Sequence, residues 1–251
     1  LSRAVADGDG ADETRAIDEA VNLSMAFTLP AAAAFLIAPF FLMHGFWTGG
    51  EFTDADARAT ADALFHYGWG VPAFVLVRIL APPFFARQDT KRPMRFALAS
   101  VAANVVLGAG FFFALRAAGH SGYVGLAIAT SAASWVNVIL LAGALLREKT
   151  WRPTAEAQSR LMRIVLATLV MGGVVAVAAS MREAIIAPFT SVLPVGGKEL
   201  AVLLVSGGAF MIFVVTAFIL RAVTLSEIRG AFRRPPPSAN GGGALPPGLD
   251  G

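Results

Sequence analysis

Residues 80–92 read "LAPPFFARQDTKR", and the fold can be worked out from the abrupt change of composition within them. Apolar residues dominate the positions before this stretch, two prolines interrupt them, and four charged residues follow between positions 87 and 92. A helix needs roughly 20 apolar residues to cross a bilayer core about 30 Å thick. The stretch therefore predicts the end of a membrane-spanning helix followed by a short charged loop.

The composition extends this interpretation to the whole chain. Of its 251 residues, 56% are hydrophobic and 15% are charged, and the mean hydropathy is +0.66. Soluble domains usually carry about 25% charged residues. The absence of cysteine excludes disulfides and thiolate metal sites. The sequence therefore predicts a membrane protein.

Six stretches are long and apolar enough to cross a membrane as helices. They are residues 23–43, 61–85, 96–115, 124–146, 161–181 and 200–223. Pro30, Pro39 and Pro72 fall inside the first two stretches. Proline is tolerable there because neighbouring groups in a membrane bundle can satisfy the backbone groups that it frees. The predicted fold is all-α, a polytopic membrane helix bundle with six transmembrane helices.

The basic residues are distributed unequally between the two sides of these spans. Fifteen of the 20 lysines and arginines lie in the segments on one side, four lie on the other side, and Arg78 falls inside a span. Cytoplasmic loops of membrane proteins carry an excess of Lys and Arg. We therefore expect both ends of this sequence to lie in the cytoplasm.

Four parts are expected along the chain. Residues 1–22 would be a cytoplasmic segment with the end of a truncated upstream helix and a loop, because the sequence starts at Leu1 without a methionine. Residues 23–147 would hold four spans, and residues 148–223 would hold two additional ones. Residues 224–251 are rich in proline and glycine, which predicts a disordered cytoplasmic tail.

Charged residues in and near the second span are the first candidates for a functional site. Those in the loop are Arg87, Asp89, Lys91 and Arg92. They could contact a substrate, or they could simply anchor the helix ends and fix the topology. Arg78 lies within the span, where a charged side chain is costly and usually faces a protein interior or a wet cavity. Its long side chain could instead extend to the lipid headgroups.

Uncharged polar residues also lie inside the predicted spans. They are Asn104, Thr130, Ser131, Ser134 and Asn137. The default interpretation is that they form hydrogen bonds between helices. Outside the spans, the sequence from Thr53 to Asp56 matches a helix-capping box, with Asp in place of the usual Glu or Gln.

Signatures of enzymes and of metal centres are missing from the sequence. His44, His66 and His120 are well separated, and the motifs of a zinc hydrolase, a P-loop and a dinucleotide site do not occur. No serine or threonine has a histidine or aspartate spaced to activate it. We therefore expect no enzyme activity, no metal centre, no cofactor and no nucleic-acid partner.

Several segments, in order along the chain, resemble the MurJ (MviN) family of lipid II flippases. The most specific are "GEFTDADARAT" with "ALFHYGWG", and "FFARQDTKRP", which is similar to the family's "FYARQDTKTP". Phe85 stands where the family often has tyrosine, and Arg92 where it often has threonine. "LSRAVADGD" is similar to the end of the family's "LPxLSR" segment, and "VGLAIATSAASWVNVILLAGALLRE" to its twelfth helix. The resemblance covers about residues 1–234.

The resemblance implies the fold of the multidrug/oligosaccharidyl-lipid/polysaccharide exporter superfamily, in which two six-helix lobes are related by pseudo-symmetry. The six spans would be helices nine to twelve of the second lobe and the two extra helices of this family. The chain would then be the C-terminal part of a flippase of the bacterial inner (cytoplasmic) membrane. Such a protein moves lipid II, the undecaprenyl-pyrophosphate-linked peptidoglycan precursor, from the inner to the outer leaflet by alternating access.

The resemblance also implies where the substrate would bind. The headgroup would lie in a cationic cavity whose main arginines belong to the first, second and eighth helices, which are missing from this sequence, and a groove formed with the last two helices would take the polyprenyl tail. Lipid II, membrane lipids and the missing N-terminal lobe of the same protein are therefore the expected partners. Some members bind sodium through the seventh, eleventh and twelfth helices, with an Asn and an Asp one turn apart on the eleventh. Asn104 and Thr130 are weak candidates for such a site, because Gly108 stands one turn after Asn104 and offers no ligand.

Two other functions fit the same residues. The protein could export another polyprenyl-linked oligosaccharide within the same superfamily. It could also be a non-transporting membrane scaffold for cell-wall assembly, which would fit the scarcity of charged residues in these spans.

Overall fold

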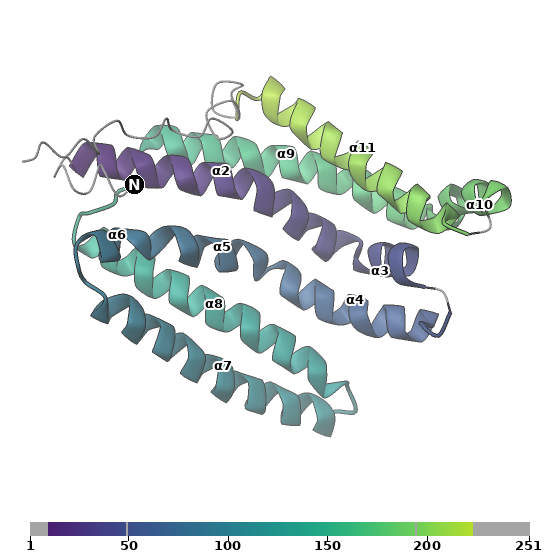
Figure 1. Cartoon of the computed structure of the whole chain (residues 1–251), viewed down its shortest axis with the longest axis horizontal. Coiled ribbons are helices and arrows are strands. Elements are labelled where there is room, and N and C mark those ends of the chain that lie inside the picture. Colours follow the sequence, from purple (N-terminus) through teal and green to yellow (C-terminus); the bar gives the residue numbers. More distant parts are fainter. Residues whose placement is uncertain (1–9, 49, 194, 223–251) are drawn as a thin grey trace, which may run out of the picture.

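The computed structural model describes residues 10–48, 50–193 and 195–222. Within these ranges the chain forms a bundle of α-helices and contains no strand (Figure 1). Six of its helical stretches are long and apolar enough to cross a membrane. The predicted all-α bundle with six transmembrane helices is therefore confirmed. Residues 1–9 and the tail expected at 224–251 lie outside the described residues.

The long helices lie side by side along one common direction (Figure 1). In chain order, the helices are α2 (Gly10–Ile37), α3 (Pro39–Trp47), α4 (Asp54–Gly68), α5 (Val71–Leu80), α6 (Pro82–Ala86), α7 (Lys91–Ala117), α8 (Gly122–Arg147), α9 (Ala155–Ser180), α10 (Arg182–Val192) and α11 (Gly197–Ile219). The second predicted span comprises α4, α5 and α6 together, and each of the other five contains one long helix.

Helix α2 begins at Gly10, well before the apolar stretch that starts at Leu23. Its 28 residues give a length of about 42 Å at 1.5 Å per residue, which exceeds a hydrocarbon core of about 30 Å. The polar first part of the helix is nevertheless packed against protein, because Glu13, Asp18 and Asn22 are all buried. The apolar stretch in the sequence therefore identifies only the second part of α2.

Prolines divide the first two spans into shorter helices. Pro39 starts α3, and the preceding Ala38 leaves the helical conformation with φ −134° and ψ 44°, as expected for a residue before proline. Pro72 lies in the first turn of α5, and Pro82 is the first residue of α6. These three prolines thus stand where a missing backbone N–H costs least, whereas Pro30 lies in the interior of α2.

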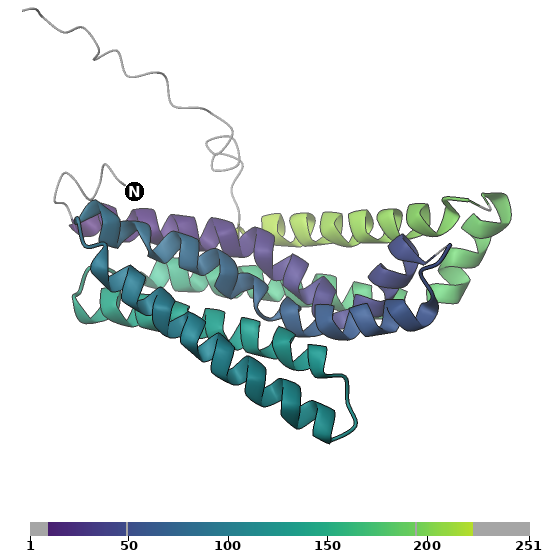
Figure 2. The same cartoon turned by 60° about the horizontal axis from the view of Figure 1, so that its bottom comes forward.

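The connection between the fifth and sixth spans contains a helix that the sequence interpretation did not include. Helix α10 lies across the ends of α9 and α11 at the bundle end opposite to the charged loop (Figures 1 and 2). Its Ile186 is buried in the core that α9 and α11 share. The mixture of charged and apolar residues in this short segment concealed the helix, because no span-length apolar run marks it.

The capping box predicted before α4 is confirmed. Thr53 Oγ1 accepts a hydrogen bond from the backbone N–H of Asp56 at 3.3 Å, and Asp56 Oδ2 accepts one from the backbone N–H of Thr53 at 2.9 Å. These two bonds satisfy donors that a helix start leaves unpaired.

Two apolar cores hold the bundle together, and α2 contributes to both. The first core joins α2 and α3 to α9, α10 and α11 through residues such as Ala26, Ile164 and Phe213. The second joins α2 to α5, α6 and α8 and includes Ile17 and Leu141. Because α2 lies between the two groups of helices, a change in this helix affects both.

Helix α7 lies at the edge of the bundle and packs mainly against α8 (Figure 1). The two helices approach closely at Gly125, where an added Cβ would come within 2.7 Å of the backbone of Phe111. The hairpin that they form diverges from the other helices toward its α7–α8 turn (Figure 2). Helix α7 is the least buried of the six candidate spans, and its outward side chains, such as Leu98 and Val106, are apolar.

Candidate functional site

The charged loop between α6 and α7 is an ordered turn. The backbone N–H of Asp89 donates to the carbonyl of Phe84 at 2.9 Å, and that of Gln88 donates to Phe85 at the same distance. Gln88 adopts the left-handed conformation with φ +60° that such a helix ending requires. Asp89 Oδ1 then accepts from the backbone N–H of Arg92 at 3.2 Å at the start of α7. The loop is therefore fixed by hydrogen bonds at both of its ends.

Arg87 joins this loop to two segments that are distant in sequence. Its Nη2 lies 2.6 Å from Glu13 Oε2 in α2, and its Nη1 donates to Thr150 Oγ1 after α8. The Glu13 side chain is only 5% exposed, whereas that of Arg87 is 36% exposed. A buried carboxylate is costly unless it is paired and hydrogen-bonded. Arg87 therefore compensates a charge inside the protein.

Asp18 makes a second connection, between α2 and the segment that precedes α9. Its Oδ1 accepts from Trp151 Nε1 at 2.8 Å. Its Oδ2 accepts from the backbone N–H of Thr154 at 3.0 Å and from Thr154 Oγ1 at 2.8 Å. We call the six residues of these two connections the polar clamp: Glu13, Asp18, Arg87, Thr150, Trp151 and Thr154. The polar clamp ties three chain segments together at the end of the bundle where basic residues gather.

Arg92 and Lys91, which are neighbours in sequence, have different surroundings. Arg92 Nε lies 3.0 Å from Asp89 Oδ2, and its Nη1 pairs with Glu148 after α8. Lys91 is exposed and forms no hydrogen bond or ion pair with any described residue. The structure therefore brings Arg87, Asp89 and Arg92 into internal contacts and leaves Lys91 available to solvent or headgroups.

Arg78 lies in the last turn of α5, and its side chain is exposed. Within the described residues it has no hydrogen bond and no ion pair. A charged side chain of this kind usually faces a wet cavity, another protein segment or the headgroup region. Arg78 therefore differs from Arg87 and Arg92, because no carboxylate of the described chain compensates it.

Asn104 and Thr130 lie close together between α7 and α8. Thr130 Oγ1 is 3.5 Å from Asn104 Oδ1, and it also donates to the carbonyl of Leu126 at 2.8 Å. Around Gly108 an added Cβ would meet the side chains of Leu126 and Ala129 at 3.5 and 3.7 Å. Two side-chain oxygens therefore face each other, and the position one turn along α7 is surrounded by apolar groups.

Hydrogen bonds between helices are confirmed for some polar residues of the spans but not for all. Ser131 Oγ donates to the carbonyl of His66 in α4 at 2.8 Å. Ser134 instead donates to Thr130 of its own helix at 2.9 Å, so the prediction was wrong for this residue. Asn137 Oδ1 is buried and has no partner among the described residues.

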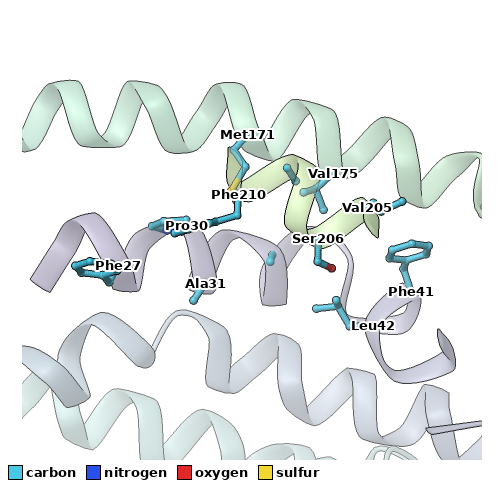
Figure 3. Close-up of a pocket in the computed structure, with 12 residues that line it drawn as sticks. Phe27, Pro30, Ala31, Phe41, Leu42, Met171, Val175, Val205, Ser206 and Phe210 are labelled. Atoms are coloured by element: carbon cyan, nitrogen blue, oxygen red, sulfur yellow. The ribbon is translucent and has the colours of Figure 1, made fainter. Parts of the chain in front are cut away.

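A pocket of about 180 Å³ opens between α2, α3, α9 and α11 (Figure 3). Its lining side chains come from Phe27, Pro30, Ala31, Ala34, Phe41, Leu42, Met171, Val175, Val205, Ser206, Ala209 and Phe210. Ser206 is the one residue with a polar side chain in this lining of described residues. Figure 3 shows Pro30, Met171 and Phe210 close together on three different helices. The pocket is therefore suited to a hydrocarbon group rather than to a charged one.

No group of three or more histidine, aspartate and glutamate side chains in the described part of the chain is arranged to hold a metal ion. The arrangement therefore offers two kinds of surface. One is the ordered basic end with its polar clamp, and the other is the apolar pocket.

Most of this sequence is similar to one known protein family. The family model described as "Lipid II flippase MurJ" matches residues 1–196. The chain belongs to the MurJ family. This result confirms the resemblance of the "FFARQDTKRP" and "GEFTDADARAT" segments to that family. As a member of the family, the chain is a multi-pass membrane protein.

Individual relatives of the MurJ family agree with this assignment. A probable lipid II flippase MurJ of Rhizobium meliloti is 32% identical over 234 residues, which are 93% of this chain and 42% of the relative. The corresponding protein of Vibrio cholerae is 30% identical over 173 residues, which are 69% of this chain and 32% of the relative. The chain thus spans less than half the length of these two proteins.

A solved structure has the same fold. It is described as "Lipid II flippase MurJ, inward closed conformation", and the similarity has a TM-score of 0.62 at 19% sequence identity. It covers 93% of this chain and 42% of the solved chain. At this identity the similarity supports the fold, and the family assignment depends on the sequence matches.

Sequence reasoning missed Glu13 and Asp18, the two carboxylates that organise the basic end of this MurJ family member. Both were placed in a polar segment expected to precede the first span. The available signal was Ile17, which is fully buried between them and marks a helical turn that packs against protein. A single apolar residue in a polar helical turn is a weak signal, so only the three-dimensional contacts reveal the clamp.

Proposed function

We propose that this chain forms the C-terminal part of a lipid II flippase. The longer protein would carry the undecaprenyl-pyrophosphate-linked peptidoglycan precursor from the inner to the outer leaflet by alternating access. The observation that carries the proposal is the match of the MurJ family model to residues 1–196. Because the chain spans 42% of its Rhizobium meliloti relative, we assign transport to the full-length protein, in which an N-terminal lobe would be the partner of this part.

The apolar pocket is our candidate for the contact with the polyprenyl tail. It lies where α2 and α3 meet α9 and α11, the two additional helices of the proposed arrangement. A hydrocarbon tail gains free energy by leaving water, and it needs no specific hydrogen bonds. The nearly complete absence of polar side chains from the lining supports this assignment.

Arg78 is our candidate for a contact with the charged headgroup. A diphosphate that leaves bulk water needs cationic partners, and Arg78 is a cation within a span that has no internal partner among the described residues. Arg87 is paired with Glu13, and Arg92 is paired with Asp89. We therefore propose that Arg87, Asp89 and Arg92 hold the loop in position and do not contact the headgroup. We propose that Lys91 lies at the cytoplasmic headgroup level and helps to fix the topology.

Asn104 and Thr130 are candidates for contributing oxygen ligands to a sodium site, since their side chains face each other between α7 and α8. Further ligands would have to come from other helices of the full-length protein or from water, because Gly108 has no side-chain ligand.

The charge distribution supports a location in the bacterial inner membrane with both ends of this sequence in the cytoplasm. We propose a transporter without enzyme activity and without a cofactor. In the proposed arrangement, residues 23–147 supply four spans of the second lobe and residues 148–223 supply the two additional helices.

The test is complementation of a bacterial strain whose own lipid II flippase can be depleted. The full-length protein is expressed there, and the arrival of labelled precursor at the outer leaflet is measured. We expect transport with the wild-type protein, a strong loss with Arg78→Ala and partial retention with Arg78→Lys. Arg95→Ala is the matched control, because Arg95 is an exposed cation at the start of α7 without a partner in the described chain. Failure of the wild-type protein to restore precursor transport would refute the proposal.

A competition experiment separates lipid II from other substrates of the superfamily. Purified full-length protein in vesicles is offered labelled lipid II together with an unlabelled polyprenyl-linked oligosaccharide. We expect unlabelled lipid II to compete and the other oligosaccharide lipid to compete much less. Equal competition would instead indicate an exporter of broader specificity.

A further inference from the structure

A second groove lies on the outer surface of the α7–α8 hairpin, away from the apolar pocket. It has a volume of about 420 Å³ and lies at the basic end of the bundle. Its walls are formed by Phe96, Ile139, Leu140, Gly143 and Ala144, and its polar rim by Arg92, Arg147 and Glu148. The groove thus combines an apolar floor with charged groups at one end.

The groove faces away from the rest of the described bundle. Leu141 and Leu145 of α8 are buried in the core with α2 and α5. At 100° per residue, Gly143 projects from the opposite side of the same helix. An added Cβ at Gly143 would meet no atom within 4 Å, and the neighbouring Ile139 is 66% exposed. The floor of the groove is therefore open to whatever surrounds the hairpin.

The two arginines of the rim, Arg92 and Arg147, differ in whether a carboxylate is paired with them. Arg92 is paired with Asp89 and with Glu148. Arg147, in the last turn of α8, has no ion pair or hydrogen bond with any described residue. The groove therefore presents one uncompensated guanidinium directly beyond its apolar floor.

We propose that this groove binds a phospholipid with a net negative headgroup, such as phosphatidylglycerol, from the leaflet at the basic end. One acyl chain would lie over Gly143 between Phe96 and Ile139, and Arg147 would donate hydrogen bonds to the phosphate. Basic sites between membrane helices on the cytoplasmic side recognise anionic headgroups in this way. A zwitterionic phospholipid would bring its own cation near Arg147, so it would bind less tightly.

This lipid would be a bound membrane component rather than the transported substrate. The groove shares no lining residue with the apolar pocket between α2, α3, α9 and α11. The proposal therefore does not depend on the proposed transport function, and it can be tested on binding alone.

The test measures phospholipid binding to the purified full-length protein in detergent by native mass spectrometry. Phosphatidylglycerol and phosphatidylcholine with identical acyl chains are titrated separately. We expect Arg147→Gln to weaken phosphatidylglycerol binding about fivefold, which corresponds to about 1 kcal/mol for one cation near the membrane surface. Phosphatidylcholine binding should change little, and Arg147→Lys should retain most of the preference for the anionic lipid.

A second variant tests the apolar floor. Gly143→Phe should fill the groove, since an added Cβ at Gly143 meets no atom within 4 Å, and it should weaken the binding of both lipids at this site. The matched controls are Gly173→Phe on α9, where an added Cβ also meets nothing within 4 Å, and Arg116→Gln at the other end of α7. Both controls should bind phosphatidylglycerol like the wild type.

Two results would overturn the proposal. One is that Arg147→Gln and Arg116→Gln have the same affinity for phosphatidylglycerol as the wild type. The other is that Gly143→Phe lowers the thermal stability of the full-length protein while lipid binding stays unchanged, since this would show that another protein segment covers the groove.

Discussion

Removal of the Arg87 guanidinium should destabilise the protein, because it leaves the carboxylate of Glu13 buried without its cation. The Glu13 side chain is 5% exposed and its Oε2 lies 2.6 Å from Arg87 Nη2. Its other oxygen, Oε1, is buried and has no partner among the described residues. The carboxylate therefore depends on Arg87 to a greater extent than a surface carboxylate would.

The magnitude follows from the burial of the two partners. Loss of one partner from a fully buried ion pair costs about 3–5 kcal/mol. Arg87 is 36% exposed, so solvent compensates part of the loss. We therefore expect Arg87→Ala to lower the free energy of unfolding by about 2–3 kcal/mol. The double variant Glu13→Leu with Arg87→Met should recover most of this loss, because it removes the uncompensated charge and keeps the packing volume.

The assay is thermal unfolding of the detergent-solubilised full-length protein, followed by tryptophan fluorescence. Trp151 donates to Asp18 within the polar clamp, so its emission should report local opening. Arg95→Ala is the matched control and should change stability by less than about 0.5 kcal/mol, as an exposed unpaired cation. The reasoning is refuted if Arg87→Ala unfolds at the same temperature as Arg95→Ala. It is equally refuted if the double variant is less stable than Arg87→Ala alone.

Three further predictions follow from single positions. Gly125→Ala should lower the free energy of unfolding by about 1–3 kcal/mol, because the added Cβ would lie 2.7 Å from the backbone of Phe111. The control is Gly110→Ala on α7, where the added Cβ meets no atom within 4 Å, and it should not lower the melting temperature. Lys149→Gly should raise stability by about 0.5–1 kcal/mol in the same melting assay, because Lys149 has φ +58°, a conformation that glycine adopts without strain; a lower melting temperature would contradict this. Lys91→Cys in a cysteine-free full-length protein should react with a membrane-impermeant maleimide only in inverted vesicles, and labelling of intact cells would show that the proposed orientation is wrong.

The sequence was sufficient to predict the number and approximate position of the spans, because the thickness of the bilayer sets the number of apolar residues that a spanning helix needs. It could not locate the beginning of α2. The residues from Gly10 onward are helical because Ile17 packs into the core and because Glu13 and Asp18 find partners more than 70 residues away. Such partners have no local signature. The same limit applies to α10, whose Ile186 is stabilised by a core built from other helices.

The sequence identified the charged residues of the candidate site, but it did not show which role each of them has. The loop "ARQDTKR" is conspicuous in the sequence, yet its charges are equally suited to substrate contact and to anchoring. The structure separates them by their partners: Arg87 and Arg92 are paired with carboxylates, whereas Lys91 and Arg78 have no partner in the described chain. Asp89, one partner of Arg92, lies within the loop, but Glu13 and Glu148 lie far from it along the chain, so the sequence does not reveal these two pairs.

The polar clamp has a consequence for the transport function that we propose for the full-length protein. Alternating access requires elements that move as rigid bodies and surfaces that remain open to lipid. Helix α2 is connected to the segments after α6 and after α8 by the Glu13–Arg87 ion pair and by three hydrogen bonds that Asp18 accepts, and these contacts resist separation of the segments. Among the described residues, the lining of the apolar pocket contains no ion pair, whereas the rim of the α7–α8 groove carries the Arg92–Glu148 pair. In the proposed transport cycle we therefore expect the basic end to move as one unit, because the polar clamp joins its three chain segments.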